Sequence, residues 1–193
     1  NKCTLGEIAD VFSATERSVD GNLHQLKVGD VNVFALPVLR RDGSCFVVWS
    51  PDTDVAVLLD QAGAVSSTYE VAEHERLSAS IPAGCVDFSR ILAMECGVVE
   101  KSISFKKGCY IGQEVTARID ARGRTHRELV LLEIDGVTDE TVVCSGDTVV
   151  GQLRSTVTDG PNRSIAICHL RNDARGEALT VGNLSVSAVR NVV

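Results

Sequence analysis

The chain has 193 residues, of which 44% are hydrophobic and 23% are charged, and its net charge is −7 at neutral pH. These values are typical of a globular protein and argue against disorder. The acidic balance argues against non-specific nucleic-acid binding. No apolar run approaches the ~18–20 residues needed to span a bilayer, and the first residues show no secretory signal. We therefore expect one large or two small domains, with no membrane or nucleic-acid partner.

The seven cysteines are odd in number, and no pair has the C-x-x-C spacing. This argues against a disulfide framework or a structural zinc site and favours a reducing compartment, either the bacterial cytoplasm or the mitochondrial matrix of a eukaryote. Most of them lie among apolar residues and are expected to be buried. Because Cys168 and His169 are adjacent in a predicted strand, their side chains point to opposite faces, and we expect no metal site.

The N-terminal third predicts a hairpin followed by a helix. Residues alternate in polarity over Val31–Leu36, turn residues follow at Arg41–Ser44, and an apolar run resumes at Cys45–Trp49. This pattern predicts a β-hairpin with Trp49 in the core. Apolar residues at helical spacing over Val55–Ala62, closed by a glycine, predict a helix and an α+β layer.

The middle of the chain predicts short elements and a long loop. Tyr69–Val71 has the composition of a short strand, and Ala72–Ala79 that of a helical turn, which Pro82 ends. Residues 83–107 have little periodicity and predict a long ordered loop, a feature that is often functional. We interpret the acidic residues of this region as a solvated helix face rather than as acid–base catalysts. They are Glu70, Glu73, Glu75 and Asp87.

A helix is predicted from Ile111 onward. Ile111, Val115 and Ile119 lie four residues apart and form one apolar face, and Glu114 can pair with Arg118. The sequence Arg-Gly-Arg at 122–124 ends the helix and predicts a domain boundary there, which gives domains of residues 1–124 and 125–193.

Six short β-rich runs separated by turn residues follow Thr125. Regular short strands of this kind predict a small antiparallel barrel or sandwich. The runs are Leu129–Ile134, Thr141–Val143, Thr148–Leu153, Ser164–His169, Ala178–Val181 and Leu184–Val189.

A cationic segment joins the two halves. Residues 101–127 contain seven Lys or Arg against Glu114 and Asp120, so this segment carries +5 and the rest of the chain −12. A local positive island on an acidic protein indicates a discrete anionic ligand. A solvated surface stretch is the alternative.

The most unusual motif lies inside this segment, at Phe105–Glu114. Two lysines and a glycine precede Cys109, close to the predicted helix start, where unpaired N–H groups stabilise an anion and favour a thiolate. Tyr110 can stack on a flat ring, and Gln113 and Glu114 can recognise the donor and acceptor edge of a heterocycle. The motif suits a flat polar ring with an anionic tail beside a reactive thiol. An ordinary helical turn with an inert cysteine would use similar residues.

The stretch Ile103–Arg118 resembles the signature of the YgfZ-type folate-binding proteins, K-G-C-Y-x-G-Q-E followed by an arginine. That family is related to the glycine-cleavage T-protein, an aminomethyltransferase. Weaker likenesses lie at Glu75–Pro82, Met94–Gly97 and Gly146–Thr156. At Glu75–Pro82 this sequence departs from the family, because serines stand at 78 and 80 where the family usually has Glu and Gly.

The resemblance implies an α+β fold, in which part of a mixed α/β, T-protein-like folate-binding domain precedes a small antiparallel β-barrel. It also implies that the family's N-terminal portion is missing from this chain; in the T-protein that portion supplies the catalytic aspartate and part of the folate site.

The implied function is tetrahydrofolate-dependent support of iron–sulfur cluster assembly or repair, with iron–sulfur client or assembly proteins as partners. Cys109 would be the chemically active group. The residues implied to bind the folate are Lys107, Tyr110, Gln113, Glu114, Arg118 and Glu95. The arginines at 122, 124 and 127 would meet a polyglutamate tail or border the interdomain linker.

Two alternatives remain open from the sequence. One is a folate-dependent aminomethyltransferase or other one-carbon transferase, which needs an acidic catalytic residue. The other is a non-catalytic interaction module in which Cys109 is structural.

Overall fold

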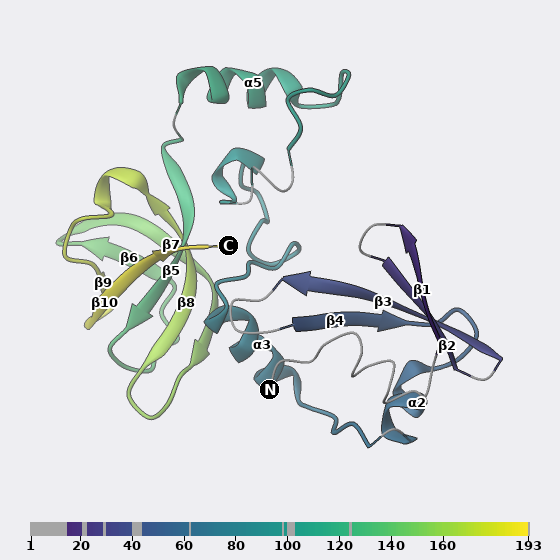
Figure 1. Cartoon of the computed structure of the whole chain (residues 1–193). Coiled ribbons are helices and arrows are strands. Elements are labelled where there is room, and N and C mark those ends of the chain that lie inside the picture. The colour runs from purple at the N-terminus through teal and green to yellow at the C-terminus, as the bar shows by residue number, and fades with distance from the viewer. Residues whose placement is uncertain are drawn as a thin grey trace. The chain divides into compact units, whose positions relative to one another are not determined.

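The computed structural model describes residues 15–20, 23–28, 30–39, 44–61, 63–97, 99, 103–123 and 125–192. The chain forms two compact units, Asn1–Thr68 and Tyr69–Val193, which we call the N-terminal unit and the barrel unit. Figure 1 shows that each unit has its own sheet.

The N-terminal unit is built on a four-stranded antiparallel sheet in the order β1-β2-β3-β4. The strands are β1 (Thr15–Asp20), β2 (Leu23–Val28), β3 (Val31–Leu39) and β4 (Ser44–Trp49), and helix α2 (Val55–Gln61) follows. The predicted hairpin is confirmed as the β3–β4 pair. Of its predicted turn at Arg41–Ser44, residues 41–43 lie outside the described residues and Ser44 is the first residue of β4. The predicted helix is confirmed as α2, whereas β1 and β2 have no counterpart among the predicted elements.

One face of this sheet carries buried side chains, and the other carries exposed apolar side chains beside polar ones. Leu26, Val33 and Ala35 are fully buried. The prediction that Trp49 lies in the core is wrong, because its side chain is 40% exposed and stacks on Phe34 at 5.7 Å between ring centroids. An aromatic residue at the end of an apolar strand does not reveal which face it occupies, since neighbouring side chains point to opposite sides.

The barrel unit begins with helix α3 (Tyr69–Ser78), followed by the short 3-10 helix η1 (Ala93–Glu95) and helix α5 (Gln113–Arg122). The predicted strand at Tyr69–Val71 is wrong, because these residues form the first turn of α3. Three residues of β-type composition are too short to outweigh a helix that carries Glu70 in its first turn and buries Leu77 in its last. The predicted end of α5 is confirmed, with Gly123 in the left-handed conformation at φ 74°.

Six antiparallel strands then close into a barrel in the order β10-β5-β8-β7-β6-β9 (Figure 1). Each strand overlaps one of the six predicted runs, so the predicted small barrel is confirmed. The strands are β5 (Arg127–Ile134), β6 (Val142–Ser145), β7 (Thr148–Thr158), β8 (Ser164–Arg171), β9 (Thr180–Val181) and β10 (Leu184–Asn191), and the 3-10 helix η2 (Asn172–Ala174) lies between β8 and β9.

Strands β5 and β8 are covered on both faces. Val130, Leu132 and Cys168 face the barrel interior, and the interior position raises the pKa of the Cys168 thiol to about 12 through burial. Leu129 and Leu131 face outward and form a second cluster with Leu77 of α3 and the apolar residues that follow this helix. Burial on both faces explains the uninterrupted apolar run in β5.

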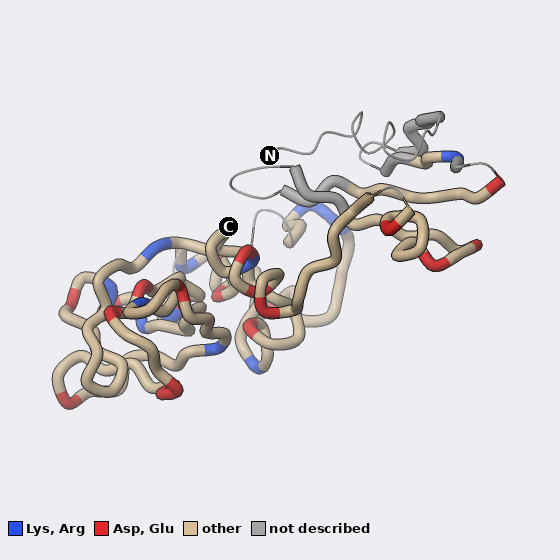
Figure 2. Tube along the Cα trace, turned by 90° about the horizontal axis from the view of Figure 1, so that it is seen from below, with Lys and Arg blue, Asp and Glu red and all other residues tan. Residues whose placement is uncertain are grey.

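The two units do not divide at the predicted boundary near Arg124. The barrel strands begin at Arg127, but α3 and η1 contact strands of the barrel and therefore belong to the same compact unit. Acidic and basic residues are interspersed along the trace of the barrel (Figure 2). Among the described residues, no helix combines the length and hydropathy needed to cross a bilayer.

Gly151 provides a test of barrel packing. A Cβ at this position would lie 2.9 Å from Cys168 Sγ and 3.3 Å from the backbone oxygen of His169, closer than atoms in a packed core tolerate. We expect Gly151→Ala to lower the free energy of unfolding by about 1–3 kcal/mol, measured by urea denaturation. Gly176→Ala is the matched control, because a Cβ there meets no atom within 4 Å. Equal stability of the two variants would contradict this packing.

Candidate functional site

The motif Phe105–Glu114 lies in the segment that connects η1 to α5. Gly112 caps the helix with φ 86°, a left-handed conformation that side chains other than glycine rarely adopt. We expected Cys109 at or just before the helix start, but α5 begins at Gln113, four residues later. The favourable effect of a helix N-terminus on anions fades within the first turn, so it contributes little at this thiol.

Cys109 is exposed, and its flanking residues form a cation–π contact. The ammonium nitrogen of Lys107 lies 4.6 Å from the centre of the Tyr110 ring. Such a contact stabilises a lysine over an aromatic face by about 0.5–1 kcal/mol at an exposed site. The thiol is therefore accessible from solvent, with a cationic and an aromatic side chain in the same short stretch.

A cleft of about 440 Å³ opens beside the motif, between η1, the connecting segment and α5. Lys107 and Tyr110 line it, whereas Cys109 does not. The hydroxyl of Tyr110 is buried and has no hydrogen-bond partner within the part of the chain that the structure describes. The remaining wall is mostly apolar: Ile91, Leu92, Ala93, Met94, Ile103, Ser104, Ile111, Gly112, Val115, Thr116 and Ile119.

The other residues predicted to bind the folate do not line this cleft. Gln113 is half-buried in the first turn of α5. Glu114 and Arg118 form the predicted i,i+4 ion pair at 2.6 Å, with side chains 84% and 65% exposed. An exposed pair of this kind has little effect on stability and leaves both groups on the helix surface.

Glu95 lies against the barrel. Its carboxylate is 3.2 Å from Nε2 of His169 on β8, and both side chains are largely buried. Burial lowers the pKa of His169, and the neighbouring Glu95 carboxylate opposes that shift. Glu95 thus joins η1 to the outer surface of the barrel, away from Lys107 and Tyr110 in the cleft wall.

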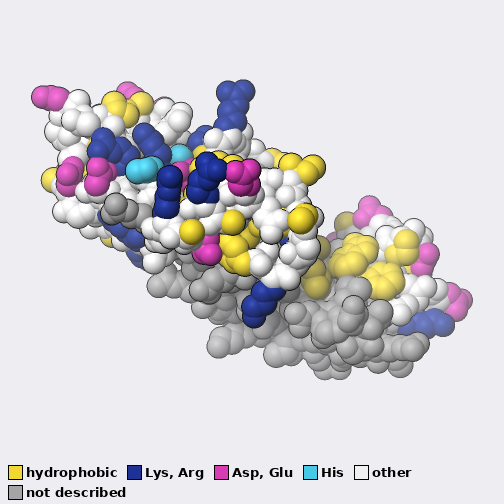
Figure 3. Space-filling model, turned by 90° about the horizontal axis from the view of Figure 1, so that it is seen from above, with side chains coloured by type: hydrophobic (Ala, Val, Ile, Leu, Met, Phe, Trp, Pro, Cys, Tyr) yellow, Lys and Arg dark blue, Asp and Glu magenta, His cyan; other side chains and the backbone are white. Residues whose placement is uncertain are grey.

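The predicted apolar face of α5 is largely exposed. The side chain of Ile111 is fully exposed, Val115 is about half exposed and Ile119 is partly buried at the cleft. Figure 3 views the molecule from above Figure 1 and shows Lys and Arg side chains beside apolar ones on this side. The cationic segment therefore has apolar as well as positive surface.

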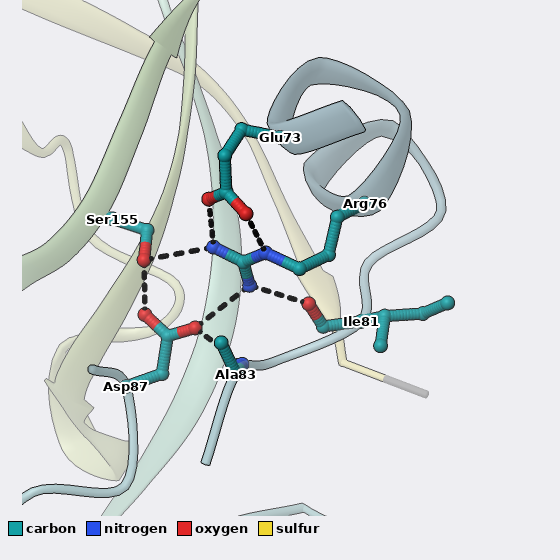
Figure 4. Close-up of polar contacts among 6 residues, drawn as sticks. All are labelled: Glu73, Arg76, Ile81, Ala83, Asp87 and Ser155. Carbon is teal, nitrogen blue, oxygen red and sulfur yellow. Dashed lines mark hydrogen bonds and ion pairs between the residues drawn. The ribbon is translucent and has the colours of Figure 1, made fainter. Parts of the chain in front are cut away.

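A buried polar cluster, which sequence reasoning missed, lies between α3 and β7 (Figure 4). Its centre is Asp87, whose side chain has no solvent exposure. The carboxylate accepts hydrogen bonds from Arg76 Nη1 at 2.8 Å, from the Ala83 backbone N–H at 2.6 Å and from Ser155 Oγ at 2.5 Å. We call these residues together with Glu73 the Asp87 cluster.

Arg76 connects the members of the Asp87 cluster. Its guanidinium forms a two-bonded pair with Glu73 at 2.6 and 2.9 Å and also donates to the backbone oxygen of Ile81. The hydrogen bonds from Arg76 lower the pKa of Glu73. The interpretation of Glu73 and Asp87 as a solvated face is therefore wrong. The sequence does contain one signal for this cluster, the position of Asp87 between Val86 and Phe88. A charged residue in an apolar run is buried only when it is paired, so this position indicates a partner for the carboxylate.

The described residues contain no group of three or more His, Cys, Asp or Glu side chains that could hold a metal ion. The cleft combines an apolar wall with the unpartnered Tyr110 hydroxyl and the Lys107 ammonium, a set that suits a flat ring with hydrogen-bonding groups and an anionic substituent. Gln113 and Glu114, which would recognise the pterin edge, lie outside its lining.

The chain matches no protein-family model. A protein of Haemophilus influenzae described as uncharacterized is 43% identical over 42 residues, which make up 22% of this chain and 15% of that protein. The similarity is therefore local and covers far less than two thirds of the relative's length.

The Asp87 cluster predicts a large and specific stability effect. Asp87→Ala leaves Arg76 buried with one carboxylate instead of two, and removing one partner of a buried ion pair costs about 3–5 kcal/mol. We expect a loss of this size in urea denaturation. Asp173→Ala, which removes the exposed partner of Arg171, is the matched control and should leave the denaturation midpoint nearly unchanged. Similar losses in both variants would contradict the assigned role.

Proposed function

We propose that this chain is part of a tetrahydrofolate-binding protein of the YgfZ type that supports iron–sulfur cluster assembly or repair. The observation that carries the proposal is an exposed thiol, Cys109, in a short segment whose Lys107 and Tyr110 line a cleft of about 440 Å³. A closed six-stranded barrel directly downstream of α5 is consistent with the fold that the resemblance implies.

Tyr110 and Lys107 are the residues proposed to hold the folate. Tyr110 would stack on, or hydrogen-bond to, the ring, and Lys107 would exchange its contact with the Tyr110 ring for a carboxylate of the ligand. Tetrahydrofolate would supply a carrier for one-carbon groups. The other residues implied to bind the folate, Gln113, Glu114, Arg118 and Glu95, lie outside the cleft lining and have no part in the proposed contact with the ring.

Cys109 is the proposed reactive group. A solvent-accessible thiolate is a good nucleophile and a soft ligand for iron, and both properties suit contact with iron–sulfur proteins. Lys106 and Lys107, close to this thiol in the sequence, would attract an anionic partner. The positive charge of residues 101–127 on an otherwise acidic chain supports the proposed attraction of an anionic partner to this segment.

The first test concerns the thiol. We expect Cys109→Ser to lose the ability to restore iron–sulfur enzyme activities in a strain that lacks the protein, because serine is neither a comparable nucleophile nor a soft ligand. Cys85→Ser is the matched control, since Cys85 is also exposed but lies outside the motif. Full restoration by Cys109→Ser would favour the interaction module with a structural cysteine.

The second test concerns the cofactor. Calorimetric titration of the full-length protein with tetrahydrofolate should show saturable binding, which Tyr110→Ala weakens by about tenfold or more, as expected for loss of a stacking ring. Tyr69→Ala is the control, because the other tyrosine of the chain does not line this cleft. Absence of heat at high micromolar ligand would remove the folate from the proposal, and robust formation of methylenetetrahydrofolate would favour the one-carbon transferase.

A further inference from the structure

A second groove, of about 580 Å³, runs between α3 and β7, away from the motif. One wall is the face of α3 that carries Tyr69, Glu70, Glu73 and His74. The opposite wall is the stretch of β7 from Arg154 to Thr158, and Val86 contributes from the loop after α3. The groove therefore lies between a helix and one end of a strand.

The β7 wall of this groove is an open strand edge. Strand β7 pairs with β8 as far as Thr158, but its pairing with β6 ends at Gln152. An irregularity in the β7–β8 pairing lies between Leu153 and Ser155, just beyond the last residue of β7 that pairs with β6. Beyond it, the described strands place a neighbour beside β7 on one side only.

The hydrogen-bond pattern shows which backbone groups face the open side. The backbone N–H of Asp159 donates to the oxygen of Arg163, at the turn between β7 and β8. Bonding alternates along an antiparallel pair, so Val157 and Ser155 direct their N–H and C=O groups toward β8. Thr156 and Thr158 consequently direct theirs away from β8. Within the described part of the chain, no backbone partner reaches them from that side.

We infer that this groove binds an extended peptide segment of a partner protein, which adds to β7 as a strand. The free groups of Thr156 and Thr158 lie two residues apart, about 6.6 Å along the strand. This spacing matches the repeat of an antiparallel partner strand, whereas a compact small molecule does not provide donors and acceptors at such a repeat. The groove of about 580 Å³ runs along this edge, and addition of an extended peptide to an exposed strand edge is a common mode of peptide recognition.

The side chains of the groove indicate the chemistry of the peptide. Arg154 Nε is buried and has no partner among the described residues, so it suits a carboxylate at the end of the peptide that lies beside it. Tyr69 and Val86 are exposed and offer apolar contact to alternate side chains. Glu73 is already paired with Arg76, and His74 with Asp159, so neither presents an uncompensated charge to the peptide.

The test uses the full chain and the peptide Ac-KVTVTD-NH2, whose acidic end falls beside Arg154 in the antiparallel orientation. We expect saturable binding by fluorescence anisotropy with a labelled peptide. On binding, the amide protons of Thr156 and Thr158 should exchange more slowly by at least about tenfold, while exchange of the Val157 amide should be unaffected because it already bonds to β8. Binding without selective protection of these two amides would overturn the inference.

Two controls make the result specific. Thr156→Pro removes an N–H on the open side without removing a bond to β8 and should abolish binding, whereas Thr156→Val keeps the N–H and should bind normally. A peptide N-methylated on the amides that face β7 should not bind to the unaltered protein, which decides the question even if the proline variant fails to fold. If the methylated peptide binds as tightly as the unmodified one, strand addition is overturned. The same holds if self-association of the protein without peptide already slows exchange of the Thr156 and Thr158 amides.

Discussion

The arrangement of the barrel unit depends on a carboxylate that water does not reach. Asp87 is held by a guanidinium, a hydroxyl and a backbone N–H, which come from α3, from β7 and from the loop that follows α3. Burying a charge is unfavourable unless all of its hydrogen-bonding capacity is used, so these three elements must meet in one geometry. The ion pair is a constraint on position more than a source of stability.

The two sites of the barrel unit follow from that constraint. Because the Asp87 cluster and Leu77 fix α3 on the outer face of the barrel, a groove remains between this helix and the open edge of β7. The same loop continues to η1, where Glu95 contacts His169 of β8. Residues of η1 line one side of the cleft beside the motif, so the barrel holds this wall in place through the contact of Glu95 with His169.

The sequence predicted the periodic parts of the fold well and the individual positions less well. Six short β-rich runs with turn residues between them specify a small barrel, because alternation and turn chemistry are local properties. The short strand at Tyr69–Val71 was wrong because a three-residue pattern is decided by tertiary packing. The exposure of Trp49 could not be predicted, since it depends on which face of the sheet is covered.

For the candidate site too, the sequence predicted local features better than it predicted contacts between distant residues. The order of residues identified Cys109, Lys107 and Tyr110 as unusual. Lys107 and Tyr110 line one cleft, and Cys109 is exposed outside its lining. The order could not show that Glu95 turns toward His169 or that Asp87 is buried, because both contacts join residues about seventy positions apart. Long-range polar pairing of this kind leaves only a weak local trace, such as a charge within an apolar run.

The closure of the barrel through β10 and β5 has a consequence for synthesis on the ribosome. Strands β7 and β8 are joined by a short turn and can pair as soon as both have emerged, whereas β5 finds its second neighbour only when Asn191 comes to lie opposite Val130. Until then, one edge of β5, most of whose residues are buried in the folded protein, remains open to other nascent chains. The interval between translation of β5 and of β10 is therefore a period in which an apolar strand edge lacks its native partner.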